Sequence, residues 1–467
     1  MSYITFEQMN KVEKFTDKLP WKLSPLQIED IVYCAYEPRT GNFSEVGAGK
    51  TVVSTGASLM AGSETTLVLV PPILVTQWVK WLKKFTDSVV DYRGTPGQRK
   101  ALKLKGQRWV VMTHGVFRKD FDRIEHDFLS TELELIVDEA QALKNVESIL
   151  YKNVARLSRN RRLQLLTGTP TSTPLDAYAY IKLKTPNIYR TRGHYESLHI
   201  ANKDFFGSVT EWRNLDQIKT NLAISTVKRT KEELFGYDLI TLYPDGEYEL
   251  SPKHMKLYQK LVDEQLLMLP EDQKIDATTS TRLYHAMQQI VMHFDYFSGD
   301  PENRSATLDI LDQVVEETNC MSMEGSKLII WTWYVKSTQK VLDYLNRDRL
   351  VAVGAYSGAN SNKSFEMFQE NPDIRVLVAS PASAGAGLNP QGVCSEMLFL
   401  ETPTTPMLVD QAVGRIVRQG QTKVPRVYFA TARGTIQEYL RQRLLEKGDL
   451  VASIENKKSL RLALLGG

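Results

Sequence analysis

Short apolar runs alternate with amphipathic stretches in the first part of the chain, from about residue 23 to residue 186. Four of these runs have the length and composition of buried parallel strands, and they cover residues 67–70, 109–112, 133–137 and 163–166. Stretches with helical spacing, such as residues 75–85, lie between them. This alternation predicts an α/β layer built on a parallel sheet.

A helical region follows at about residues 251–297, and the α/β pattern then restarts. Ser251 and Pro252 form a typical N-cap and first-turn proline. Apolar residues recur behind them at helical spacing, at Met255, Tyr258, Val262, Leu266 and Leu269. Strand-like runs return at residues 328–331, 350–353, 376–379, 397–400 and 427–429. We therefore expect two α/β lobes, at residues 1–235 and 306–467, joined by a helical insert at residues 236–305.

Composition changes this picture mainly by exclusion. The 58 basic and 55 acidic residues leave a net charge of +3, which is too small to indicate a polyanion partner. Cys34, Cys320 and Cys394 lie far apart, so we expect neither a disulfide framework nor a zinc site. No apolar run is long enough to span a bilayer, and the polar N-terminus lacks a signal-peptide core. These features predict a cytoplasmic protein with no membrane partner.

Residues 45–53 carry the most informative chemistry. Glycines let backbone N–H groups approach phosphates, and the start of the following helix adds positive potential. Lys50 can then reach the β- and γ-phosphates, and the Thr51 hydroxyl can hold Mg²⁺. The full phosphate-loop pattern has glycine at position 44, where this chain has Ser44, so an ordinary helix-start turn is the alternative. The expected nucleotide-binding residues are Gly47, Ala48, Gly49, Lys50 and Thr51.

Two carboxylates, Asp138 and Glu139, directly follow the apolar run at residues 133–137. The carboxyl ends of parallel strands are where α/β sheets bind ligands. A nucleotide site needs one carboxylate to hold Mg²⁺ and a polar group to orient the attacking water. We assign the first role to Asp138, together with Thr51, and the second to Glu139. The alternative is that both residues cap the next helix.

Further motifs follow in a fixed order. They are Leu-Ser-Pro-Leu-Gln at residues 23–27, residues 71–78, the acidic segment 138–145, Leu-Leu-Thr-Gly-Thr-Pro at residues 165–170, and residues 227–234, 250–258, 380–389 and 411–423. In order and spacing these motifs resemble helicase superfamily two, and in particular its Swi/Snf-type double-stranded DNA translocases. The resemblance runs from about residue 23 to residue 447. Gln141 and Val417 stand where that family usually has histidine.

The resemblance implies two tandem RecA-like lobes with parallel sheets, and an ATP hydrolase that uses Mg²⁺. By this resemblance Gln27 and Gly387 contribute to nucleotide binding. Arg415 and Arg418 are three positions apart, hence on one helical face, and would spread positive charge over the transferring phosphoryl group. Coupling between the lobes is assigned to Thr167, Thr169 and Gln411.

The resemblance also implies sequence-independent contacts with DNA phosphates. The matching residues are Pro71, Gln77, Thr113, His114, Lys144, Ser357, Gly358, Ser380 and Ala384. Basic clusters at residues 93–108 and 156–162 either extend this track or are solvated surface. The aromatic and basic residues at 190–213 either grip DNA or pack against the first lobe.

The favoured function is an ATP-driven translocase that remodels duplex or branched DNA, by branch migration or fork remodelling. One alternative is the same motor displacing a bound protein, such as RNA polymerase, from DNA. Another is a nucleotide-dependent DNA-binding switch without translocation. The compact motif arrangement favours a bacterial or phage enzyme over a chromatin remodeller.

Overall fold

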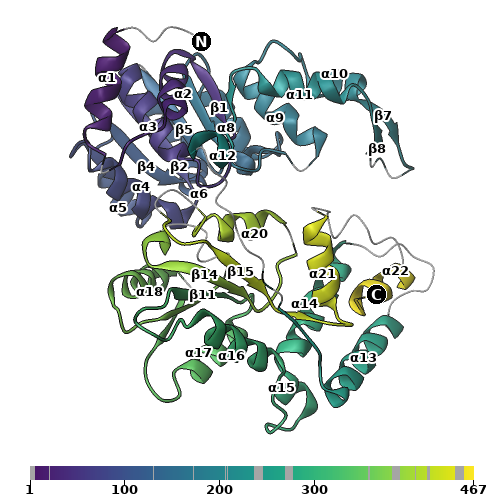
Figure 1. Ribbon diagram of the computed structural model, residues 1–467. Coiled ribbons are helices and arrows are strands. Elements are labelled where there is room, and N and C mark those ends of the chain that lie inside the picture. Colours follow the sequence, from purple (N-terminus) through teal and green to yellow (C-terminus); the bar gives the residue numbers. More distant parts are fainter. Residues whose placement is uncertain are drawn as a thin grey trace. The chain divides into compact units, whose positions relative to one another are not determined.

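Two parallel β-sheets organise the two units into which contacts divide the chain, Met1–Asp238 and Leu239–Gly467 (Figure 1). The computed structural model describes residues 6–19, 21–129, 131–171, 173–205, 207, 209–235, 244, 246–268, 277–355, 358–380, 390–404, 406–417, 421–446 and 457–466. The predicted α/β fold with parallel sheets is confirmed in both units. Within these ranges no helix has the length and apolar character needed to cross a membrane.

Unit 1 contains a seven-stranded sheet in the order β3-β4-β2-β5-β6-β1-β9, and every neighbouring pair is parallel. The apolar runs of the sequence form its centre, because strands covered on both faces must be apolar on both. The strands are β1 (Arg39–Asn42), β2 (Thr65–Val70), β3 (Val89–Asp91), β4 (Trp109–Thr113), β5 (Leu133–Asp138), β6 (Arg162–Leu166) and β9 (Thr226–Val227).

Helices cover both faces of this sheet (Figure 1). Leu67 and Leu135 point into the core formed with α6 to α9, whereas Thr66 points the other way and bonds Ser58 of α3. The helices are α1 (Phe6–Thr16), α2 (Pro25–Tyr36), α3 (Lys50–Ala61), α4 (Val75–Leu82), α5 (Pro96–Ala101), α6 (His114–Lys119), α7 (Phe121–Asp127), α8 (Ile149–Leu157), α9 (Pro174–Lys184) and α12 (Lys231–Phe235), with short 3₁₀ turns η1 (Pro72–Leu74) and η2 (Ala140–Leu143).

The segment at residues 190–213 forms a helix and a two-stranded antiparallel hairpin. It comprises α10 (Arg192–His199), β7 (Ile200–Lys203) and β8 (Val209–Trp212), and α11 (Leu215–Ala223) follows. Tyr195 is fully buried against Tyr178 and Tyr189, so this aromatic residue packs against the rest of the unit. Phe205, between the two strands, is instead 97% exposed.

Unit 2 contains a five-stranded parallel sheet in the order β12-β13-β11-β14-β15. Its strands are β11 (Lys327–Trp331), β12 (Ala352–Ala355), β13 (Val376–Ala379), β14 (Cys394–Phe399) and β15 (Arg426–Phe429). The associated helices are α16 (Thr307–Thr318), α17 (Val335–Leu345), α18 (Gly358–Glu370) and α20 (Pro406–Val413), with the turn η3 (Pro390–Gly392).

The helices that follow residue 251 share a core with the C-terminal helices. Tyr258 and Tyr284 pack there against Leu440 and Leu464, and β10 (Glu247–Tyr248) pairs with β16 (Thr431–Ala432). The helices are α13 (Pro252–Leu267), α14 (Ala277–Met292), α15 (Phe294–Ser298), α21 (Ile436–Leu445) and α22 (Lys457–Leu464). The helices of the insert proposed at residues 236–305 therefore share a core with the C-terminal helices, and the proposed domain boundary near residue 305 remains a prediction.

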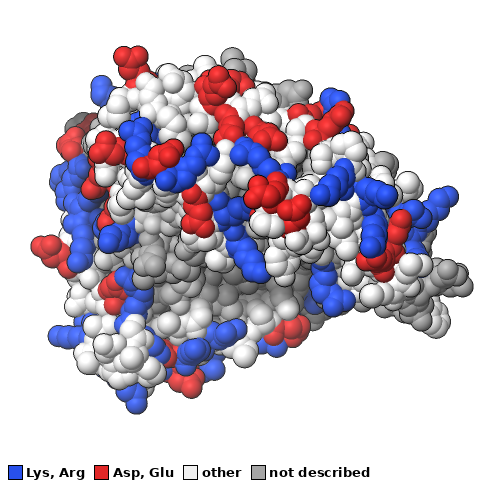
Figure 2. Space-filling model, turned by 90° about the horizontal axis from the view of Figure 1, so that it is seen from below, with Lys and Arg blue, Asp and Glu red and all other residues white. Residues whose placement is uncertain are grey.

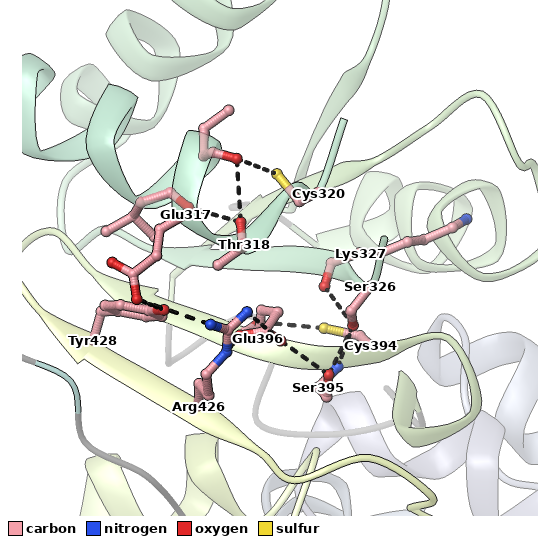
Figure 3. Close-up of polar contacts among 12 residues, drawn as sticks. Glu317, Thr318, Cys320, Ser326, Lys327, Cys394, Ser395, Glu396, Arg426 and Tyr428 are labelled. Carbon is pink, nitrogen blue, oxygen red and sulfur yellow. Dashed lines mark hydrogen bonds and ion pairs between the residues drawn. The ribbon is translucent and has the colours of Figure 1, made fainter. Parts of the chain in front are cut away.

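A polar network closes the amino edge of the unit 2 sheet (Figure 3). Glu396 on β14 is almost fully buried, and it accepts two hydrogen bonds from the Arg426 guanidinium on β15, at 2.9 and 3.2 Å. Glu317 accepts a hydrogen bond from Tyr428 at 2.8 Å. The pairing with Arg426 offsets part of the cost of burying this carboxylate, although burial still raises the pKa of Glu396.

A second buried carboxylate, Glu401, lies just beyond the carboxyl end of β14. It accepts hydrogen bonds from the N–H groups of Trp333 and Tyr334 and from the Ser337 hydroxyl, and thereby holds the start of α17. Burial nevertheless raises the pKa of Glu401 from 4.5 to about 7. The folded protein therefore holds this proton more tightly than the unfolded chain does.

Replacing Glu401 with glutamine should change how stability depends on pH. Ionisation of Glu401 costs the folded state of the wild type free energy between its unfolded and folded pKa values, from 4.5 to about 7. We expect the stability of the wild type relative to Glu401→Gln to fall by about 2–3 kcal/mol between pH 5 and pH 8. Urea unfolding of the wild type and of Glu401→Gln at pH 5 and pH 8 measures this difference in stability. A difference that stays the same at both pH values would contradict the raised pKa of Glu401.

Candidate nucleotide site

The predicted motifs of unit 1 meet at the carboxyl edge of its sheet. Because all the strands are parallel, the segments after β1, β2, β4, β5 and β6 leave the sheet at this one edge. These segments carry the glycine-rich loop at residues 43–49, the proline pair at 71–72, His114, the acidic pair and the 167–170 turn. Residues far apart in the sequence are thereby brought to one place.

The glycine-rich loop leads directly into α3. Gly47 and Gly49 have φ angles of 89° and 82°, a conformation that favours glycine. Lys50 begins the helix, and its Nζ donates to the carbonyl oxygens of Ser44 and Glu45, at 2.8 and 2.9 Å. The loop therefore holds an ammonium group beside a helix N-terminus, which is an arrangement suited to phosphate.

Gln27 connects α2 to this loop. Its side chain completes a capping box with Ser24, accepting from the Ser24 N–H at 3.0 Å. Its Nε2 donates to the Ala48 carbonyl at 3.3 Å. Gly49 passes so close that a Cβ there would lie 2.7 Å from the same Nε2. The predicted proximity of Gln27 to the loop is thus present, with a direct contact.

An ion pair that the sequence did not reveal also reaches the loop. The Arg229 guanidinium bonds both carboxylate oxygens of the buried Asp30 on α2, at 2.8 to 3.2 Å. The Arg229 N–H donates to the Ser44 hydroxyl at 3.1 Å, and its carbonyl accepts from the Glu45 N–H at 3.0 Å. The only sequence signal was the basic segment at residues 227–234, which does not indicate a partner.

The acidic pair lies at the end of β5. The Asp138 carboxylate is largely buried, and it accepts from the Trp78 indole at 2.8 Å and from the Glu139 N–H at 2.9 Å. Burial, together with the neighbouring Glu139 charge, raises the pKa of Asp138. Glu139 has a φ of 49°, a conformation that costs a non-glycine residue roughly 1–2 kcal/mol. Such strain is characteristic of functional sites.

A chain of hydrogen bonds joins the acidic pair to the 167–170 turn. Gln141 Nε2 donates to Glu139 at 2.7 Å, and Gln141 Oε1 accepts from the Thr167 hydroxyl at 2.8 Å. The Thr169 N–H in turn donates to Thr167 Oγ1 at 3.1 Å. Gly168 lies against the loop, since a Cβ there would be 2.9 Å from Val46. Gln141 thus bridges two of the predicted motifs.

The residues assigned to nucleic acid in unit 1 have varied environments. Pro71 follows β2, and Thr113 caps α6. The His114 Nε2 lies 3.0 Å from the Asp138 carbonyl oxygen, and burial lowers the pKa of this imidazole. Lys144 forms an ion pair with Asp176 at 3.2 Å. These contacts tie several of the residues into the fold, and their role toward nucleic acid stays a prediction, as it does for Gln77 on α4.

In unit 2, the described candidates follow strands or lie near helix ends. Ser380 follows β13, Gly358 begins α18 and Gln411 belongs to α20. Arg415 is not in the regular helix we expected, because α20 ends at Val413, immediately before a glycine, and Arg415 lies in the turn beyond it. Other candidates lie outside the described residues, namely Ser357, Ala384, Gly387 and Arg418.

Basic residues are used partly inside the fold. Arg99 is buried and bonds Asp120 at 2.6 and 3.0 Å, and Arg108 donates to Ser58 and Thr66. The side chains of these two arginines of the 93–108 cluster are therefore bonded within unit 1. On the face shown in Figure 2, Lys and Arg side chains are interspersed with Asp and Glu.

The donor set suits a magnesium nucleotide. Mg²⁺ prefers hard oxygen ligands and usually takes one or two carboxylates together with phosphate oxygens. Thr51 in the first turn of α3 offers a hydroxyl, and Asp138 offers a carboxylate whose orientation two hydrogen bonds fix. The Lys50 ammonium lies at the same edge, because a Cβ at Gly168 in the 167–170 turn would be 3.6 Å from its Nζ.

The fold and this edge define a parallel α/β protein with a phosphate-loop turn. The family model described as SNF2-related domain matches residues 28–295, more than half of the chain. The chain therefore belongs to the SNF2-related domain family.

Similar proteins include helicases of bacteria and mammals. The chain is 26% identical, over 87% of its length, to the uncharacterized ATP-dependent helicase MG018 of Mycoplasma genitalium. It is 22% identical, over 99% of its length, to the DNA annealing helicase and endonuclease ZRANB3 of Mus musculus. It spans about two fifths of these relatives, 39% and 43% of their lengths. A Sulfolobus solfataricus SWI2/SNF2 ATPase core in complex with dsDNA matches with 20% identity and a TM-score of 0.41, covering 93% of this chain and 94% of that one.

Replacing Gly49 with alanine should destabilise the protein more than the same change at Gly62. Both glycines have left-handed φ angles, 82° and 75°, so each alanine pays a similar backbone cost of about 1 kcal/mol. A Cβ at Gly62 meets nothing within 4 Å, whereas at Gly49 it displaces the buried Gln27 amide. We expect an additional loss of about 1 kcal/mol for Gly49→Ala, measured by urea unfolding. Equal losses would show that Gln27 does not constrain the loop.

Proposed function

We propose that this chain is an ATP hydrolase that uses the energy to translocate along double-stranded or branched DNA. The observation that carries the proposal is the meeting of Lys50, Asp138, Glu139 and the 167–170 turn at one edge of a parallel sheet. Membership in the SNF2-related domain family supports ATP as the nucleotide and DNA as the polymer.

The loop residues would bind and orient the ATP phosphates. The Lys50 ammonium, held by two carbonyl oxygens, offers its charge to the β- and γ-phosphates, and the N–H groups of the first turn of α3 face the same anion. Bound Mg²⁺, held by Thr51 and Asp138, would neutralise charge on the phosphate oxygens. Glu139 would orient the attacking water, and Gln141 holds the Glu139 side chain for that role.

Conversion of hydrolysis into movement is assigned to the Gln141–Thr167 bridge and to the second unit. A change at the γ-phosphate alters the surroundings of Glu139, and the hydrogen-bonded chain passes this change to the 167–170 turn. Arg415 and Arg418 would add positive charge to the transferring phosphoryl group. Closing and opening of the two units would then accompany each ATP cycle.

The DNA contacts would fall on the phosphate backbone, without base recognition. Remodelling of forks or junctions follows if the same motor works against a branch, and protein displacement follows if it works against an obstacle. A motor is favoured over a switch without translocation because the chain carries the whole set of residues proposed for hydrolysis, namely Lys50, Asp138, Glu139, Arg415 and Arg418.

Replacing Lys50 with alanine should abolish most ATP turnover. The substitution removes the cation that faces the phosphates, and loss of one such electrostatic group typically costs about 100- to 1000-fold in kcat. Lys152→Ala serves as the control, because Lys152 is exposed on α8 and pairs with Glu147 on the surface. Steady-state phosphate release measures both variants, and DNA-stimulated turnover retained by Lys50→Ala would refute the site.

Duplex or branched DNA should raise ATP turnover more than single-stranded DNA or RNA does. Because the proposed contacts reach only phosphates, the logarithm of DNA affinity should fall linearly with the logarithm of salt concentration, with similar slopes for unrelated sequences.

Displacement of a triplex-forming strand tests movement separately from binding. DNA-stimulated hydrolysis without triplex displacement would support the switch and contradict the motor.

A further inference from the structure

A buried hydrogen bond links α4 to the acidic pair. The Trp78 indole Nε1 donates to Asp138 Oδ2 at 2.8 Å, across 60 positions of sequence. Trp78 is 1% exposed and Asp138 is 9% exposed, so water competes little for this bond. Trp78 lies in the motif at residues 71–78, to which the sequence assigned only nucleic-acid contacts.

The two carboxylate oxygens of Asp138 each have one fixed donor. Oδ2 accepts from the Trp78 indole and Oδ1 accepts from the Glu139 N–H at 2.9 Å. The donors come from different elements, α4 and the β5 edge, so the plane of the carboxylate is fixed from two sides. Each oxygen still has a lone pair that can accept from a further group.

The chemistry of indole suits this position. Its N–H is a donor only and carries no charge, so it orients a carboxylate without neutralising it. A lysine or arginine in its place would compete electrostatically with a divalent cation. Indole is also large enough to exclude water from one side of the carboxylate while packing against its neighbours.

We propose that Trp78 is a positioning residue that fixes the Asp138 carboxylate for the magnesium ion of Mg–ATP. The inference rests on the proposed function, and it assigns to the 71–78 motif a role in the nucleotide site besides any role toward DNA. Trp78 acts through the orientation of Asp138, to which its indole N–H is hydrogen-bonded. Partners of this kind typically change metal affinity 10- to 100-fold when they are removed.

The chain offers a matched control on the same helix. Trp81 lies three residues further along α4, and its indole donates to the Thr55 hydroxyl at 3.0 Å. Trp78→Phe and Trp81→Phe therefore make the same chemical change and each remove one indole hydrogen bond. Only the first bond reaches the acidic pair.

The test measures binding of a fluorescent ADP analogue to the full chain, as a function of Mg²⁺ concentration. We expect Trp78→Phe to raise the Mg²⁺ concentration for half-maximal binding at least about 10-fold. Binding without Mg²⁺ should stay within about twofold of the wild type, because the loop is unchanged. Trp81→Phe should match the wild type in both conditions. Equal Mg²⁺ dependence of the two variants would overturn the proposal.

A second variant covers the case in which Trp78→Phe does not fold. Trp78→His keeps a ring N–H donor, and it should bind Mg²⁺–ADP within about threefold of the wild type. A loss of 10-fold or more in a folded Trp78→His protein would show that the fit of the ring, rather than the hydrogen bond, sets the affinity. If the wild type itself bound no nucleotide, the proposed function would fail, and the role of Trp78 with it.

Discussion

Parallel pairing of the strands in unit 1 is the constraint on which the site depends. Parallel strands all end at the same edge of a sheet, so the loops that follow β1, β5 and β6 are neighbours whatever their separation in sequence. Apolar side chains on both faces, such as those of β2 and β5, are what keep this pairing in place. The hydrogen bonds of Gln27, Trp78 and Gln141 then act on a frame that burial has already fixed.

The sequence alone predicted the central strands of unit 1 and the glycine-rich turn that leads into α3. The apolar runs at 67–70, 109–112, 133–137 and 163–166 fall within strands β2, β4, β5 and β6. They were visible because a strand buried on both faces needs consecutive apolar residues. The resemblance assigned Gln27 to nucleotide binding, whereas its hydrogen bond to the Ala48 carbonyl of the loop is known only from the structure. The family is confirmed, whereas the roles of individual site residues remain predictions.

Other parts could not be predicted, for identifiable reasons. Strand β1 reads Arg-Thr-Gly-Asn and has no apolar pattern, because Gly41 leaves room for the Phe43 ring and Asn42 caps the Ser44 N–H. The run at 350–353 begins two residues before β12, because Leu350 is exposed beyond the strand. Pairs such as Arg229 with Asp30, or Trp78 with Asp138, join distant residues of common types, so no local pattern distinguishes them.

The location of the nucleotide phosphates is the most direct test of the account. Crystals of the chain grown with Mn²⁺ and a non-hydrolysable ATP analogue would show the metal by its anomalous scattering. We expect a peak beside the Thr51 hydroxyl, on the side of Asp138, with the phosphates against the N–H groups of residues 47–50. Phosphates bound away from this loop, or a metal at another edge of the sheet, would contradict it.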